Sequence, residues 1–262
     1  FRNAEDKGIS IKNIGLSEGA IEYYKSIGKE IYIIYDNVGK FSEGFAPVYK
    51  EGKGRNYINE QGELLWKEKK WFDYAYSFSE GFASVKIKGK GWNYINKQGE
   101  LLWKEDKWVN NAWVFFQGFA CVQIEGRGWN YINTQGELLW NKDKWFDDVY
   151  NFHEGFAWVK YKGKWNYINT NGKLLWEEDK NFDKVCKFSG GFAGVKIEGR
   201  GWNYINTKGE LLWEGDEWFD YVDNFYNGFA RVKLDSKYNF INKQGEYLWK
   251  GYQWFDGIGY FS

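Results

Sequence analysis

The chain repeats itself about every 37 residues, and this periodicity restricts its fold more than any other feature of the sequence. The tripeptide Gly-Phe-Ala occurs six times, at spacings of 37, 37, 37, 36 and 37 residues, beginning at Gly44, Gly81, Gly118, Gly155, Gly191 and Gly228. Each copy is followed by Tyr-Ile-Asn or Phe-Ile-Asn, and then by Leu-Leu-Trp or Tyr-Leu-Trp. A unit this short cannot bury its own apolar face, so neighbouring units must stack on one another.

The segments within one unit read as short β-strands. In FASVKI (82–87), the residues Ala83, Val85 and Ile87 alternate with more polar positions and are expected on one face. WNYIN (92–96) is aromatic and β-branched, which favours a second strand. GELLW (99–103) and WFDYAYSF (71–78) are predicted to supply two more strands, which gives four strands per unit.

Two recurrent turns connect these strands. In Asn96-Lys97-Gln98-Gly99 the Asn favours the first position of a type I turn, and the Gly accepts the left-handed conformation that follows. The stretch KGKG (88–91) is predicted to form the other hairpin turn, and its shortened copy explains the single spacing of 36 residues.

We therefore predict an all-β fold, a solenoid-like, curved tandem array of six antiparallel β-hairpin repeats of about 37 residues. A six-bladed β-propeller is the alternative, because four short strands would also make a small blade. Residues 1–40 are predicted to hold a degenerate N-terminal capping repeat over 16–40, with a helix over 17–28 as the competing prediction. The six repeats are placed at 41–77, 78–114, 115–151, 152–187, 188–224 and 225–262.

Composition excludes several classes of partner. The 36 basic and 36 acidic residues balance, so the chain has no electrostatic footprint for nucleic acid. No stretch approaches the roughly 20 apolar residues of a membrane span. The chain contains no Met, so we expect it to be a processed or truncated product.

These motifs resemble the bacterial WG-repeat family, also found in phage, whose units read approximately F-S-E-G-L-A-x-V, K-W/Y-G-Y-I-D and x-x-G-K. The resemblance is carried by FSEGFASVKIKGKGWNYINKQGELLW (78–103) and extends over residues 41–262. The chain departs from the family where Asn93, Asn130, Asn166 and Asn203 replace the Gly after Trp, and where Asn replaces Asp after Tyr-Ile. The resemblance implies a repetitive β-structure that serves as an interaction module and has no general catalytic role.

Tryptophan is unusually abundant, and of its 17 copies all but Trp113 and Trp158 fall at three fixed phases of the repeat. The copies that close Leu-Leu-Trp occur in every unit and are predicted to form the structural core: Trp66, Trp103, Trp140, Trp176, Trp213 and Trp249. The other two phases vary more between units and are the candidate ligand-facing residues: Trp92, Trp129, Trp165, Trp202, Trp71, Trp108, Trp145 and Trp218. For all of them a purely structural role in stacking remains the competing interpretation.

No catalytic, metal or cofactor site is predicted. The recurring acids, Glu43 and Asp73 with their copies, fit turn-capping roles better than the single asymmetric pair of a glycosidase. His153 is the only histidine, too few for a usual zinc site or a Ser-His-Asp triad. Cys121 and Cys186 lie 65 residues apart at different phases and are expected to be free thiols.

The sequence thus favours a non-enzymatic scaffold that binds a macromolecular partner. A protein is the favoured partner, because aromatic-rich surfaces of mixed charge are typical of protein interfaces. The alternative is a carbohydrate-binding module that presents Trp and Tyr rings to a glycan of a cell wall or similar polymer.

Overall fold

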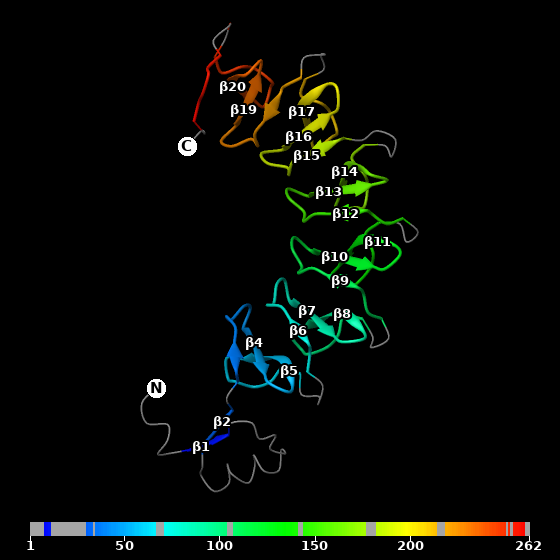
Figure 1. The fold of residues 1–262 in the computed structure, drawn as a ribbon, viewed down its shortest axis with the longest axis vertical. Helices are drawn as coiled ribbons and strands as arrows, with labels where there is room; N and C mark the ends of the chain where they lie inside the picture. Colours follow the sequence, from blue (N-terminus) through cyan, green and yellow to red (C-terminus); the bar gives the residue numbers. More distant parts are fainter. Residues whose placement is uncertain are drawn as a thin grey trace.

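A computed structural model describes residues 8–11, 30–33, 35–66, 71–103, 107–140, 144–176, 182–213, 218–249, 251 and 254–259. Within these ranges the chain forms six three-stranded antiparallel sheets in tandem and one pair of parallel strands. The sheets follow one another along an open arc, with the first and the sixth at opposite ends (Figure 1). The arrangement is therefore the predicted curved array and not a closed ring. No helix in the described ranges is long and apolar enough to cross a membrane.

Each sheet contains one two-residue strand and one hairpin of two six-residue strands. The parallel pair is β1 (Gly8–Ile11) and β2 (Glu30–Ile33). The first to sixth sheets comprise β3 (Asn37–Val38), β4 (Phe45–Lys50) and β5 (Gly54–Asn59); β6 (Tyr74–Ala75), β7 (Phe82–Ile87) and β8 (Gly91–Asn96); β9 (Asn111–Ala112), β10 (Phe119–Ile124) and β11 (Gly128–Asn133); β12 (Asp148–Val149), β13 (Phe156–Tyr161) and β14 (Lys164–Asn169); β15 (Lys184–Val185), β16 (Phe192–Ile197) and β17 (Gly201–Asn206); and β18 (Tyr221–Val222), β19 (Phe229–Leu234) and β20 (Lys237–Asn242). The predicted capping repeat over 16–40 and the competing helix over 17–28 lie mostly outside the described residues.

The structure corrects the predicted four-stranded unit. The Leu-Leu-Trp segment forms no strand in the described ranges and contributes only isolated bridges such as Ile95–Leu101. The segment before each Gly-Phe-Ala is shared between two sheets. Before the third Gly-Phe-Ala, for example, Val109 forms a bridge with Trp92 of the preceding sheet, and β9 then pairs with β10 of the following sheet. Each sheet therefore crosses a boundary of the sequence repeat and links two successive units through its backbone.

A buried asparagine takes the place of the missing fourth strand. Asn93 is fully buried at the outer edge of β8, between the two bridges. Its Nδ2 donates to the carbonyls of Trp103 and Lys107, at 3.1 and 3.2 Å, and its Oδ1 accepts from the N–H groups of Tyr94 and Trp103, at 2.7 and 3.3 Å. Buried backbone groups must be paired, so this side chain anchors the Leu-Leu-Trp segment to the sheet. The equivalent residues Asn56, Asn130, Asn166, Asn203 and Asn239 are also buried.

The hydrophobic core lies between the sheets and not within any one of them. Of the predicted face of Ala83, Val85 and Ile87, the first two are fully buried and pack with Tyr57 of the preceding sheet, whereas Ile87 is half-buried. Four more clusters of the same composition fill the successive junctions. In each junction one tyrosine crosses to the next sheet, as where the Tyr94 hydroxyl donates to the carbonyl of Trp113 at 2.6 Å. The prediction that neighbouring units complete each other's interior is confirmed.

Candidate binding surface

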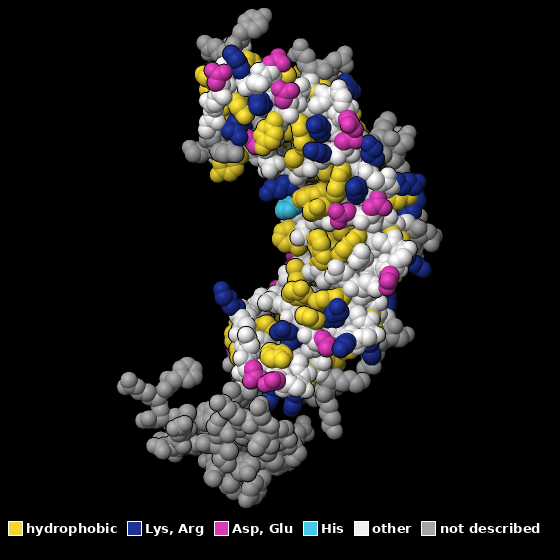
Figure 2. Space-filling model, in the orientation of Figure 1, with side chains coloured by type: hydrophobic (Ala, Val, Ile, Leu, Met, Phe, Trp, Pro, Cys, Tyr) yellow, Lys and Arg dark blue, Asp and Glu magenta, His cyan; other side chains and the backbone are white. Residues whose placement is uncertain are grey.

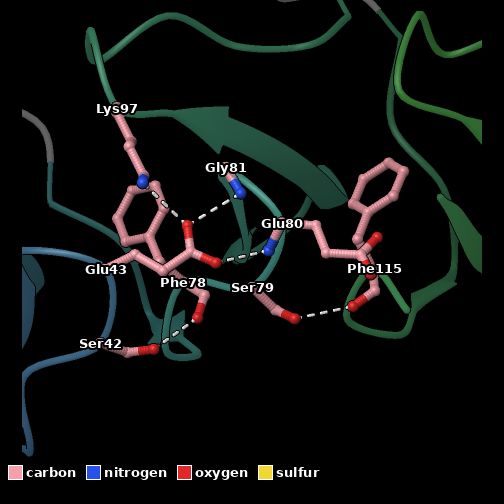
Figure 3. A network of polar contacts seen from close by, with 8 residues as sticks. All are labelled: Ser42, Glu43, Phe78, Ser79, Glu80, Gly81, Lys97 and Phe115. Atoms are coloured by element: carbon pink, nitrogen blue, oxygen red, sulfur yellow. Dashed lines mark hydrogen bonds and ion pairs between the residues drawn. The ribbon is translucent and has the colours of Figure 1, made fainter. Parts of the chain in front are cut away.

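A serine–glutamate pair clamps neighbouring units together at the turn before the first and the second Gly-Phe-Ala. Ser42 Oγ donates to the carbonyl of Phe78, at 2.7 Å, one unit further along. The carboxylate of Glu43 accepts from the backbone N–H groups of Glu80 and Gly81, at 2.6 and 2.9 Å, and pairs with Lys97 at 2.9 Å (Figure 3). Burial opposes ionisation of Glu43, but the hydrogen bonds from Lys97 and the two N–H groups outweigh it and lower its pKa. The same pattern recurs from Ser79 and Glu80 to the third unit.

The complete pair is confined to the first two units. At its third position Phe116 and Gln117 replace Ser and Glu, and at its fourth position His153 replaces Ser. The side chain of Phe116 is 40% exposed and lies against His153, with ring centres 6.0 Å apart. Aromatic side chains thus replace the serine at the third and fourth turns, although Glu154 of the fourth turn still accepts from the N–H groups of Gly190 and Gly191.

The repeated carboxylates are occupied in holding backbone turns. Asp73 accepts from the N–H of Lys88 in the next hairpin turn, and Asp183 does the same for Glu198 at 2.6 Å. Hydrogen bonds from the Lys164 side chain and from the Glu198 N–H lower the pKa of Asp183. No group of three or more His, Cys, Asp or Glu side chains suited to a metal ion occurs among the described residues.

One position on each sheet differs between all six units. The residue after each short strand lies opposite the third residue of the first six-residue strand. Its N–H donates to the carbonyl of that third residue, as from Tyr76 to Ser84 at 3.0 Å. These variable pairs are Gly39 with Pro47, Tyr76 with Ser84, Trp113 with Cys121, Tyr150 with Trp158, Cys186 with Gly194, and Asp223 with Arg231. The Phe-Ala before the third residue and the Val after it are the same in all six units, so these pairs give each sheet its individual surface.

Aromatic rings gather around the variable pairs of the second, third and fourth sheets. Tyr150 stacks on Trp158 with ring centres 4.9 Å apart, and His153 stacks on the same indole at 5.7 Å. Figure 2 shows hydrophobic side chains gathered over the middle of the arc, with charged side chains of both signs around them. We call this the aromatic surface, and it comprises Tyr76, Trp113, Phe116, Tyr150, His153 and Trp158, backed by Trp92, Trp129 and Trp165.

A groove of about 410 Å³ opens in this surface between the second and third sheets. Tyr76 and Trp113 provide its aromatic walls, Ser84 lies buried in it, and the side chains of Asn111 and Asn151 add amides. The Ser84 hydroxyl has no hydrogen-bond partner within the described part of the chain. The groove therefore combines apolar walls with an unsatisfied polar group.

The predicted tryptophans are not separated by phase into core and surface. Among the candidate ligand-facing residues, Trp92, Trp145 and Trp218 are buried, whereas Trp71, Trp108, Trp129, Trp165 and Trp202 are half-buried. Among the predicted core residues, Trp66, Trp103 and Trp140 are buried, and Trp176, Trp213 and Trp249 are half-buried. Cations cover several of the indoles, as where Lys86 lies 5.5 Å from the ring centre of Trp92.

Sequence reasoning did not identify the variable pairs. Trp113 and Trp158 were recognised only as falling outside the three phases, and Tyr76 and Tyr150 were not selected. A comparison of the six copies does contain the signal: the third residue of the Phe-Ala-x-Val strand is Pro, Ser, Cys, Trp, Gly and Arg in turn. Variation at one position that lies between invariant neighbours indicates where a repeat scaffold carries its specificity.

Comparison with known proteins finds four segments of the chain that match a repeat family. The chain is similar to the solved structures of the computationally designed Ika8 protein (12% identity, 85% of this chain and 75% of that chain, TM-score 0.37), of AztD from Citrobacter koseri (13%, 86% and 76%, 0.41) and of the WD40 β-propeller domain of Doa1 (12%, 83% and 83%, 0.34). No curated protein matches the sequence. Residues 30–53, 72–90, 146–165 and 219–238 match the family described as WG containing repeat, so the resemblance is confirmed.

Proposed function

Because the chain is an array of WG containing repeats, we propose that it is a non-enzymatic scaffold that binds a protein partner through the aromatic surface. The observation that carries the proposal is the exposure of large side chains on consecutive sheets. Tyr76 is 53% exposed, Phe116 40% and Tyr150 38%, and all three adjoin rings that are themselves packed. Tyr, Trp and Phe are enriched at the centres of protein interfaces, where they bury large areas at low entropic cost.

The backbone supports recognition by side chains and not by strand addition. The carbonyls of Tyr76 and Phe78, at the free edge of the second sheet, accept from Tyr57 and Ser42 of the preceding unit. A partner strand would have to displace these hydrogen bonds to pair with the edge. The repeated carboxylates hold turns, which supports a role in binding and not in acid–base chemistry.

A glycan is the second candidate, but the ring arrangement favours it less. Sugar platforms need flat aromatic faces open to solvent. The indole of Trp92 is instead covered by Tyr76, at 5.5 Å with an interplanar angle of 22°, and by Lys86. Tyr150 and His153 similarly stack against Trp158.

Site-specific photo-crosslinking tests the proposal. A benzophenone amino acid is introduced in place of Phe116 or, as a matched control, in place of Tyr226, which occupies the same turn position in the sixth unit and is 61% exposed. We expect a discrete protein adduct from position 116 in the native host and none from position 226. The purified partner should then bind Phe116→Asp at least tenfold more weakly than the unaltered chain, a loss of about 1.4 kcal/mol, and should bind Tyr226→Asp as tightly as the unaltered chain.

Equal labelling at the two positions, or no adduct at either, would reject the aromatic surface as a protein-binding site. A sugar array provides the alternative outcome. Binding of a neutral oligosaccharide that quenches Trp fluorescence and is lost in Phe116→Asp would replace the protein by a glycan.

A further inference from the structure

The turn before the sixth Gly-Phe-Ala, which we call the sixth turn, keeps the backbone of the clamp but faces no glutamate. Asn227 and Gly228 have φ angles of 48° and 87°. The matching angles are 52° and 86° at Glu80 and Gly81, whose N–H groups hold the carboxylate of Glu43 (Figure 3). Successive N–H groups in such a turn form a concave site for an anion. The sixth turn therefore presents the same pair of donors as the second.

The serine half of the clamp is also present at this junction. Ser189 Oγ donates to the carbonyl of Phe225 at 2.8 Å, and the same bond at the first junction measures 2.7 Å. The fifth and sixth units are thus held so that a glutamate next to Ser189 would reach the sixth turn. That residue is Gly190, and no residue in the described part of the chain accepts a hydrogen bond from either N–H of the turn.

A lysine completes this set of donors. Lys243 occupies the position of Lys97, the lysine that pairs with Glu43 at 2.9 Å. A Cβ added at Gly190 would lie 3.5 Å from both Cε and Nζ of Lys243, so the ammonium lies beside the path of a glutamate side chain. Lys243 and Asn227 are exposed, and Lys243 has no ion pair within the described ranges. All three groups that hold the carboxylate at the first junction are therefore present and accessible at the sixth turn.

The other units show which ligand this arrangement takes. Glu80 and Glu154 are each held by two adjacent N–H groups of the next unit, at 2.7 or 2.8 Å, with threonine at the position of the lysine. In both cases the two N–H groups donate to different oxygens of one carboxylate. Two N–H groups are thus enough, and a cation adds a charge-assisted hydrogen bond. Gly190 leaves the space of one glutamate side chain, which matches a carboxylate on a short carbon stem.

We propose that the sixth turn is a binding site for a small carboxylate, held by the N–H groups of Asn227 and Gly228 and by the ammonium of Lys243. A ligand that binds the folded array and not the unfolded chain also stabilises the array by mass action. The site lies on the sixth sheet, outside the aromatic surface. It is therefore a second site that goes beyond the proposed function and does not rest on it.

Titrations followed by nuclear magnetic resonance test the proposal. Propionate is the probe, because it has the carbon skeleton of a glutamate side chain. Propionamide keeps this shape without the charge, and inorganic phosphate is an anion of different geometry. Each compound is added at constant ionic strength to the isotopically labelled full chain, and the amide signals of Asn227 and Gly228 are followed.

Three variants accompany the unaltered chain. Gly190→Glu supplies a carboxylate from the chain itself, and its backbone should accept the change because Glu43 adopts a φ of 52° and Gly190 a φ of 63°. Lys243→Gln removes the cation. Glu43→Gly is the matched control, because it leaves the same donors without an acid at the first junction, with Lys97 in place of Lys243.

We expect propionate to cause saturable shifts of both amide signals and propionamide to cause none. Gly190→Glu should abolish the response, since its own carboxylate takes the site. Lys243→Gln should weaken binding about two- to fivefold, the effect of losing an exposed ion pair. Glu43→Gly should add a second response, at the amides of Glu80 and Gly81.

An unchanged response in Gly190→Glu, or no saturable shift in the unaltered chain, would overturn the proposal. A response to propionamide would show that charge is not recognised, and equal binding of phosphate would overturn the assignment to carboxylates. A second response missing from Glu43→Gly would show that these donors do not make a carboxylate site. None of these results bears on crosslinking from position 116, so this site and the proposed function are tested separately.

Discussion

Replacement of Asn93 by alanine tests whether one buried side chain substitutes for a strand. In the native protein Asn93 satisfies three backbone groups of buried residues: the N–H of Tyr94 and both the N–H and the carbonyl of Trp103. Its fourth bond, to the carbonyl of Lys107, is only part-buried and is left out of the sum. Alanine would leave these groups buried and unpaired. Each orphaned buried group costs about 1–3 kcal/mol, and partial access of water keeps the sum near the low end. We therefore expect a loss of about 3 kcal/mol in the free energy of unfolding.

Asn96→Ala is the matched control. Asn96 also makes several hydrogen bonds, to the N–H groups of Gln98 and Glu100 and to the Glu100 carboxylate, but these contacts lie at the surface. Water can replace them, so we expect a loss of about 1 kcal/mol or less. The comparison holds residue type constant and varies burial.

Urea denaturation followed by tryptophan fluorescence measures both losses. Asn93→Asp adds a sharper test, because it keeps the acceptor but points a carboxylate at the Trp103 carbonyl, and it should be less stable than Asn93→Ala. If Asn93→Ala loses less than about 1 kcal/mol, or no more than Asn96→Ala, then the asparagine does not anchor the Leu-Leu-Trp segment and the reasoning is refuted.

Three further predictions follow from backbone geometry, thiol burial and the clamp. Gly91→Ala should cost more than about 2 kcal/mol in urea denaturation, because its φ of 114° is left-handed and a Cβ there would lie 2.5 Å from a carbonyl oxygen. Gly89→Ala, whose Cβ meets nothing within 4 Å, should cost about 1 kcal/mol, and equal losses would contradict the close approach. Burial raises the pKa of both thiols, but Cys186 is half-buried whereas Cys121 is buried. Iodoacetamide at pH 8 should therefore label Cys186 first, as followed by mass spectrometry. Simultaneous labelling would show that the junction between the third and fourth sheets opens. The pKa of Glu43 is lowered in the folded protein, so the contribution of its carboxylate to stability is complete above the ordinary carboxyl pKa near 4.5 and is lost as the pH falls through the folded pKa. The urea midpoint of Glu43→Gln should therefore fall less steeply below pH 4.5 than that of the unaltered chain. An unchanged slope would show that the clamp does not contribute to acid unfolding.

Much of the architecture could be predicted from the sequence because every unit repeats the same turn motifs and strand patterns. The Asn-x-x-Gly spacing predicted the turn that the structure shows at Asn96, where the N–H of Gly99 donates to the Asn96 carbonyl at 3.0 Å. The alternation in 82–87 predicted the buried face only in part: Ala83 and Val85 are buried, but Ile87 is half-buried and Ser84 of the opposite face is also buried. The sequence predicted turn-capping roles for the recurring acids, and Asp73 and Glu43 both accept hydrogen bonds from backbone N–H groups.

The candidate site was less predictable, since strand patterns do not say which sheet faces which. Trp92 was predicted to face a ligand, but the ring of Tyr76 and the side chain of Lys86 cover it. Trp113 and Tyr76 lie 37 residues apart in the sequence and become opposite walls of one groove only through stacking. Their role depends on the volume left between two sheets, which no local pattern encodes.

Turns and hydrophobic alternation are local properties, and the chain repeats them six times. They are therefore enough to specify a tandem β-array whose units must pack against one another. Only the tertiary structure decided that each sheet borrows its first strand from the unit before it, that Asn93 replaces a fourth strand, and that Ser84 opposite Ala112 leaves a groove. These features depend on which side chains meet across a junction and how completely they fill it. Such packing is decided in space, between residues that the chain keeps far apart.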